Sequence, residues 1–103
     1  MAVGKENYVY LKSFFKKLRG MLARRIDART YVLCGCSSIH TCGMIKPIDV
    51  AFVSVEGEVL EVKRKVKPFA FLKNTKAYFV IERFSSDEEW FCAGEVISEL
   101  KGF

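Results

Sequence analysis

The spacing of apolar residues changes near residue 30, and this change predicts two kinds of secondary structure. Between residues 9 and 26, apolar side chains recur every three or four positions, and lysines and arginines fall mostly on the opposite side of that period. The pattern predicts an amphipathic helix over residues 9–26. Gly20 lies inside it and costs about 1 kcal/mol relative to alanine, so it marks either a break or a close approach to another element.

From residue 30 onward the pattern is typical of β-strands. Residues 30–34 are a short run of residue types that favour strands. Residues 48–55 are apolar on both faces apart from two polar positions, which predicts a central strand that is covered on both sides. Residues 58–67 alternate between apolar and charged side chains after a turn at Glu56-Gly57. This alternation predicts a hairpin partner with one wet face and a lysine-protected edge.

The last third of the chain predicts one further strand pair around a short helical turn. Residues 77–84 are strongly β-prone, and residues 86–89 match the capping box that opens a helix, here over residues 90–92. Residues 95–100 complete the pattern as a last strand. The predicted fold is therefore α+β, with an N-terminal amphipathic helix packed on a small, mostly antiparallel curled sheet or half-open barrel.

The size of the chain predicts a single domain over residues 1–103. Half of its 103 residues are apolar and 28% are charged, a balance that argues against a disordered chain. A chain of this length buries about 65% of its unfolded surface, which is sufficient for one core. No internal repeat or linker interrupts the sequence.

Positive charge is concentrated at the start of the chain. Residues 1–29 hold eight of the 17 basic residues and two of the 12 acidic ones. Such a segment can attract nucleic acid or anionic lipid, but it is more often the solvated face of one helix. A domain this small needs its apolar faces for its own core, so we expect packing rather than membrane binding, and we do not expect nucleic acid as a partner. The partner is open between a small ligand and a protein, and so is the oligomeric state.

The sequence shows no pattern of a secretory signal or of a membrane span. The start of the chain holds no apolar stretch of the length that a secretory signal needs, and no segment approaches the length of a membrane span. We therefore expect a cytoplasmic protein. Its cysteines are then interpreted as free thiols, metal ligands or catalytic groups before disulfides.

Residues 34–49 are the segment in which chemistry is concentrated, because they hold three of the four cysteines and the only histidine. Cys34, Cys36, His40 and Cys42 are soft ligands that suit zinc. Their spacing lacks the paired C-x2-C knuckles of structural zinc sites, so we expect no bound metal. The chain also lacks the phosphate-binding and dinucleotide-binding glycine motifs, so we expect no cofactor.

Two functional interpretations of this segment remain, beside a purely structural one. A thiol nucleophile at Cys36 or Cys42, with His40 as base and Asp49 to orient it, would make a Cys/His-dependent enzyme for a small substrate. Alternatively, the hydroxyl and imidazole groups of the segment bind a polar ligand or a partner. Because no convincing set of nucleophile, base and orienting group is visible, we expect a non-enzymatic binding or accessory module with its site at residues 36–49.

Several stretches resemble the DUF192 family, also called UPF0127. Residues 15–24 resemble its basic helix, and Cys36-Ser-Ser-Ile-His-Thr-Cys-Gly-Met44 followed by Pro47-Ile-Asp-Val-Ala-Phe52 looks like its central motif. The resemblance covers roughly residues 10–98 and implies a small, half-barrel-like α+β domain. It implies no established biochemical role. The motif positions that it carries over are Arg19, Cys36, His40, Thr41, Met44, Pro47 and Asp49. We expect Arg19 to pair with Asp49, and Cys36, His40 and Thr41 to line a shallow pocket.

Overall fold

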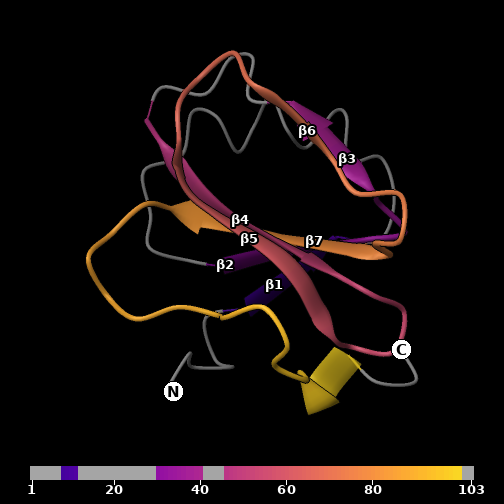
Figure 1. The fold of residues 1–103 in the computed structure, drawn as a ribbon. Coiled ribbons are helices and arrows are strands. Elements are labelled where there is room, and N and C mark those ends of the chain that lie inside the picture. The colour runs from indigo at the N-terminus through magenta and orange to yellow at the C-terminus, as the bar shows by residue number, and fades with distance from the viewer. Residues whose placement is uncertain (1–7, 12–29, 41–45, 101–103) are drawn as a thin grey trace.

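The architecture is a five-stranded sheet that is covered on each face by a different part of the chain (Figure 1). The computed structural model describes residues 8–11, 30–40 and 46–100. In spatial order, the strands of the main sheet are β1 (Tyr8–Leu11), β2 (Thr30–Cys34), β7 (Phe79–Phe84), β4 (Ile48–Val53) and β5 (Val59–Val66). β1 runs parallel to β2, and the remaining neighbours are antiparallel.

A second, two-stranded sheet lies above the main sheet in the view of Figure 1. It pairs β3 (Ser38–His40) with β6 (Phe71–Lys73) in antiparallel register. The opposite face of the main sheet is covered by the segment that follows β7, which ends in η2, a 3-10 helix over Ser98–Leu100. The main sheet is therefore the middle one of three layers.

β4 lies between the two cores of the molecule, and all six of its side chains are buried. Its alternation divides the interior into two cores. Ile48, Val50 and Phe52 belong to the core that faces the two-stranded sheet, where Leu72 of β6 packs against them. Ala51 and Val53 belong to the other core, which is closed by Trp90, Phe91, Ile97 and Leu100.

The predicted α+β fold is wrong for the described part of the chain, where the sheets occur without an α-helix. The predicted helix over residues 9–26 begins in β1, which is extended; the rest of that range lies outside the described residues. Tyr8, Val9 and Tyr10 are residue types that favour strands, and pairing with the fully buried β2 satisfies the hydrogen-bonding groups on one side of the β1 backbone. Pairing with a distant segment thus outweighs the helical period.

The predicted strands over residues 30–34, 48–55, 58–67 and 77–84 are confirmed, with small differences at their ends. The helical turn predicted after residue 86 is wrong, and the segment is irregular. The strand predicted over residues 95–100 is also wrong. Its only ladder contact is an isolated bridge between Glu58 and Val96, after which the chain turns into η2. The two short strands β3 and β6 were not expected.

Phe52 fills the centre of the core that faces the two-stranded sheet, and it is 1% exposed. We predict that Phe52→Ala lowers the free energy of unfolding by about 3–5 kcal/mol, because it removes a buried ring and leaves a cavity. Equilibrium unfolding in urea measures this change. Val55→Ala is the control, since Val55 is 57% exposed, and it should change stability by less than about 0.5 kcal/mol. Equal losses in the two variants would contradict the central position of β4.

Candidate functional site

Asp49 is a fully buried carboxylate near the start of β4. It lies opposite an irregularity in β5, because Ile48 pairs with Val66 whereas Val50 pairs with Lys63. Two residues of β5 therefore lie against one of β4, which is the arrangement of a β-bulge. A bulge leaves backbone groups without ladder partners, so something else must bind them.

The two oxygens of Asp49 bind four donors from two neighbouring strands and the residue after β7. Oδ1 accepts hydrogen bonds from the backbone N–H of Lys65, at 2.9 Å, and from the hydroxyl of Ser85, at 2.7 Å. Oδ2 lies 3.0 Å from Nε of Arg83 and 3.1 Å from Nε of Arg64. The carboxylate thus satisfies the bulge and neutralises part of the charge of two arginines.

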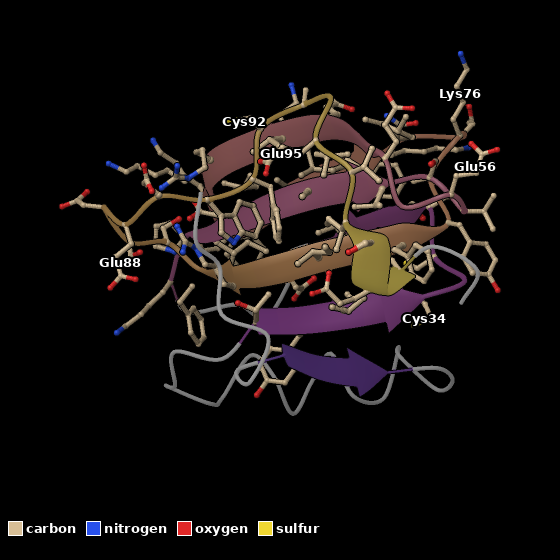
Figure 2. The ribbon with its side chains drawn as sticks, turned by 90° about the horizontal axis from the view of Figure 1, so that it is seen from below. Cys34, Glu56, Lys76, Glu88, Cys92 and Glu95 are labelled. Atoms are coloured by element: carbon tan, nitrogen blue, oxygen red, sulfur yellow. The ribbon has the colours of Figure 1, made fainter. Side chains whose placement is uncertain are left out.

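The same arginines hold the segment that follows β7. Nη2 of Arg83 donates to the carbonyl of Glu88 at 3.0 Å, and Nη2 of Arg64 donates to the carbonyl of Ser86 at 2.8 Å. The guanidinium of Arg83 also lies over the ring of Trp90, 5.0 Å from its centroid. These contacts place the Asp49 cluster at the end of the molecule where Figure 2 labels Glu88.

The pKa of Asp49 lies below its ordinary value. Burial is the largest single influence and acts to raise this pKa. The hydrogen bonds from the Lys65 backbone and the Ser85 hydroxyl, with those from Arg83 and Arg64, together outweigh burial and stabilise the ionised form. The carboxylate is therefore charged at neutral pH and has no room for a further partner, so it is not placed to act as a base.

The site predicted at residues 36–49 is only partly within the described residues. Asp49 binds Arg64 and Arg83, whereas Arg19, the partner we expected, lies outside them, as do Thr41 and Met44.

Cys36 is 4% exposed, and its thiol donates to the carbonyl of Ser38 at 3.0 Å. The Cys36 thiol is therefore an interior group, placed by Gly35, whose φ of +70° turns the chain after β2. His40 ends β3, and its backbone pairs with Phe71 of β6.

The described residues contain no cluster of three His, Cys, Asp or Glu side chains arranged to hold a metal ion. The thiols of Cys34 and Cys36 are buried, and that of Cys92 is exposed. Figure 2 shows Cys92 next to Glu95, and the Glu95 carboxylate accepts the backbone N–H of Cys92 at 2.5 Å. Cys42, the fourth member of the zinc hypothesis, lies outside the described residues.

The sequence interpretation missed two exposed phenylalanines, one in the turn between β5 and β6 and one at the start of β6. Phe69 is 80% exposed and Phe71 is 65% exposed. Phe69 also has a φ of +67°, a conformation in which a side chain with a Cβ atom is strained. The run Pro68-Phe-Ala-Phe-Leu72 between two lysines is the sequence signal that could have identified this turn, since such a run would ordinarily be buried.

The segment around these phenylalanines is strongly basic. Residues 63–73 contain five basic residues and no acidic one. The ion pair between Lys65 and Asp87 spans 3.9 Å and joins two exposed side chains, so solvent screens most of its attraction. The residues from β5 to β6 therefore combine exposed aromatic surface with positive charge.

Comparison with known proteins identifies a fold but no function. No protein-family profile matches the chain, and no curated protein matches it. A protein of unknown function from Novosphingobium aromaticivorans is similar in structure, with a TM-score of 0.62 at 11% identity. The match covers 76% of this chain and 62% of that chain, so this chain spans less than two thirds of that protein.

A protein from Sinorhizobium meliloti that is described as a "putative transcription regulator" has a TM-score of 0.61 at 13% identity. It covers 76% of this chain and 67% of that one. At these identities the likeness concerns the fold alone.

No helix in the described segments has the length and apolar character needed to cross a bilayer.

We predict that Ser85→Ala lowers the free energy of unfolding by about 1.5–3 kcal/mol at neutral pH, because it removes a hydrogen bond to a buried charge. The loss should shrink as pH falls. The pKa of Asp49 is lower in the folded than in the unfolded protein, so the stabilisation by its charged form is complete above about pH 5 and disappears as pH falls through the folded pKa. Urea unfolding between pH 7 and pH 3 measures both effects.

Ser86→Ala is the matched control for this experiment. The Ser86 hydroxyl accepts the backbone N–H of Glu88 at 3.2 Å and makes no bond to Asp49. Its removal should cost less, by an amount that does not change with pH. A deficit in Ser85→Ala that stays constant from pH 7 to pH 3 would contradict the proposed role of the Asp49 charge.

We predict that iodoacetamide modifies Cys92 in the folded protein while Cys34 and Cys36 stay protected. Cys92 is exposed, whereas the other two thiols are buried and react only when the chain opens. Peptide mass spectrometry after timed alkylation measures each site separately, and the same reaction in urea is the control in which all three react. Alkylation of Cys36 at the rate of Cys92 in the folded protein would favour the Cys/His-dependent enzyme.

Proposed function

We propose that this domain is a non-catalytic binding module that binds its partner through the two-stranded sheet of β3 and β6 and the turn before β6. The segment in which the sequence concentrates its polar chemistry contributes β3, and the exposed phenylalanines lie on β6 and the turn before it. The backbone register pairs His40 with Phe71, so the two segments lie side by side. The proposed contact surface therefore joins residues 38–40 to residues 69–73.

Support for a binding function comes first from the chemically active side chains. The carboxylate of Asp49 is fully occupied by four donors, and the thiol of Cys36 is buried and bonded to a carbonyl. A general base or a nucleophile needs access to a substrate atom. These two groups instead stabilise the fold, whereas the exposed rings of Phe69 and Phe71 bury little surface within it.

The backbone of Phe69 is the observation that carries the proposal. Lys65 and Phe69 are the two described residues other than glycine with a positive φ. The strain at Lys65 is offset, because its N–H binds Asp49. Phe69 has an 80% exposed side chain in a turn after proline, where glycine or asparagine is the usual residue. A residue that costs stability and buries little surface is best explained by contact with a partner.

We also propose that the chain is a DUF192 member that works in the cytoplasm. The family proposal is supported by the motif Pro47-Ile-Asp-Val-Ala-Phe52, whose aspartate is the centre of the buried cluster and whose phenylalanine fills a core. The cytoplasmic proposal is supported by the thiol of Cys92, which is exposed and not part of a disulfide, because reduced cysteines are typical of that compartment.

We predict that Phe69→Asn leaves the free energy of unfolding unchanged or raises it by up to about 1 kcal/mol. Asparagine tolerates a positive φ, so the substitution relieves strain without the extra unfolded-state entropy of glycine. Urea unfolding measures stability, and a binding assay with the partner measures function, which the same variant should lose. The proposal thus requires that Phe69→Asn weakens binding to the partner, while the free energy of unfolding stays the same or rises.

Phe79→Asn is the contrasting control, because Phe79 is fully buried in β7 and its loss should destabilise the fold strongly. If Phe69→Asn instead lowers stability by more than about 1 kcal/mol, Phe69 is a structural residue and the proposed function loses its main support.

A further inference from the structure

The turn from β5 to β6 presents an apolar tip that the rest of the domain does not cover. Leu72 packs against the core, whereas Phe69 and Phe71 are mostly exposed. Figure 1 shows this turn at the top of the view, on the side of the main sheet opposite to η2. Two neighbouring exposed aromatic side chains, one in this turn and one at the start of β6, form a surface suited to contact with a partner.

The charge around this tip is positive on both sides in the sequence. Lys67 precedes the apolar run and Lys73 follows it. Leu72 points inward and packs against the core, while Phe71 and Lys73 on either side of it are exposed and share the outer face of β6. Of the acidic residues 87–89 in the segment after β7, Asp87 pairs at 3.9 Å with Lys65 of β5, while Lys73 lies on β6, on the other side of the apolar run. A basic surface with an apolar centre is complementary to an anionic partner.

We infer that the partner of this turn and of β6 is the surface of an anionic lipid membrane, into which Phe69 and Phe71 insert; the inference rests on the binding function proposed above. In the membrane interface, apolar side chains enter the boundary between headgroups and acyl chains while lysines stay at the level of the phosphates. Anionic lipids attract each lysine near the surface, and salt weakens this attraction.

The chemistry of the tip favours lipid over nucleic acid. Single-stranded nucleic acid also binds to exposed aromatic rings next to positive charge. However, the side chains of residues 68–72 are those of proline, phenylalanine, alanine and leucine, and none carries a hydrogen-bonding group. Such a tip offers nothing to base edges or sugar hydroxyls, whereas all of its surface gains from contact with acyl chains.

A tryptophan probe at the tip tests the insertion directly. Trp90 is the only tryptophan of the chain and is 3% exposed, so it gives a constant background. On vesicles of phosphatidylcholine with about 30% phosphatidylserine, Phe69→Trp should show a blue-shifted emission that brominated acyl chains quench. Val55→Trp is the matched control: Val55 is exposed in the turn between β4 and β5, at the end of the molecule where Figure 2 labels Glu56, and its emission should not shift.

Partition onto the same vesicles tests the contributing side chains. The double variant Phe69→Asn with Phe71→Ser should bind at least about tenfold more weakly. Lys73→Glu should reduce partition more than about fivefold. Lys76 is labelled at the same end of Figure 2 as Glu56, and Lys76→Glu should change partition less than about twofold. Raising the salt concentration should weaken the binding of the unaltered protein.

Four results would overturn the lipid inference. They are absence of binding to anionic vesicles, equal binding to vesicles of phosphatidylcholine alone, Phe69-dependent binding to a single-stranded oligonucleotide but not to vesicles, and Phe69-dependent self-association without lipid. The second, third and fourth of these leave the binding module in place and change only its partner. The proposed function itself fails on a different measurement, the loss of stability in Phe69→Asn.

Discussion

The buried carboxylate of Asp49 is the constraint that determines how the central strands and the segment after β7 fit together. One negative charge lies between two guanidinium groups, so the cluster carries an excess of positive charge that must be stabilised elsewhere. The carbonyls of Ser86 and Glu88 and the ring of Trp90 take up that excess. The irregular path of residues 85–90 is therefore a consequence of the charge in the sheet, and no helical turn forms there.

A buried ion pair is a weak source of net stability, because desolvation offsets much of the attraction between the charges. Its value here lies in geometry. The Asp49 oxygens bind the N–H of Lys65 in the bulge of β5, the hydroxyl of Ser85 and the side chains of two strands, and no apolar residue could replace these directional bonds. Asp49 thereby fixes the register of β5, and with it the position at which β5 ends and the exposed turn begins.

The sequence predicts the strands well where the pattern of burial is local. The fully buried β4 reads as a continuous apolar run, and β5 reads as an alternation, so their positions follow from periodicity. β1 could not be found in this way, because its pairing with β2 depends on a partner about 20 residues away, and its four residues also fit a helical period. β3 and β6 have three residues each, which is too short to show any period.

The candidate site also has a part that local sequence predicts and a part that depends on distant pairing. Asp49 stands out in an apolar strand, so the sequence identifies it as important, but its partners Arg64 and Arg83 come from strands whose register only the fold reveals. For Phe69, prediction from the sequence is wrong for the opposite reason. The run Pro68-Phe-Ala-Phe-Leu72 signals a turn, but phenylalanine is ordinarily a core residue, so the sequence does not show that Phe69 takes a positive φ and leaves its ring exposed. Strain and exposure at one aromatic residue are properties of the folded backbone. Together they distinguish a side chain that stabilises the fold from one that does not.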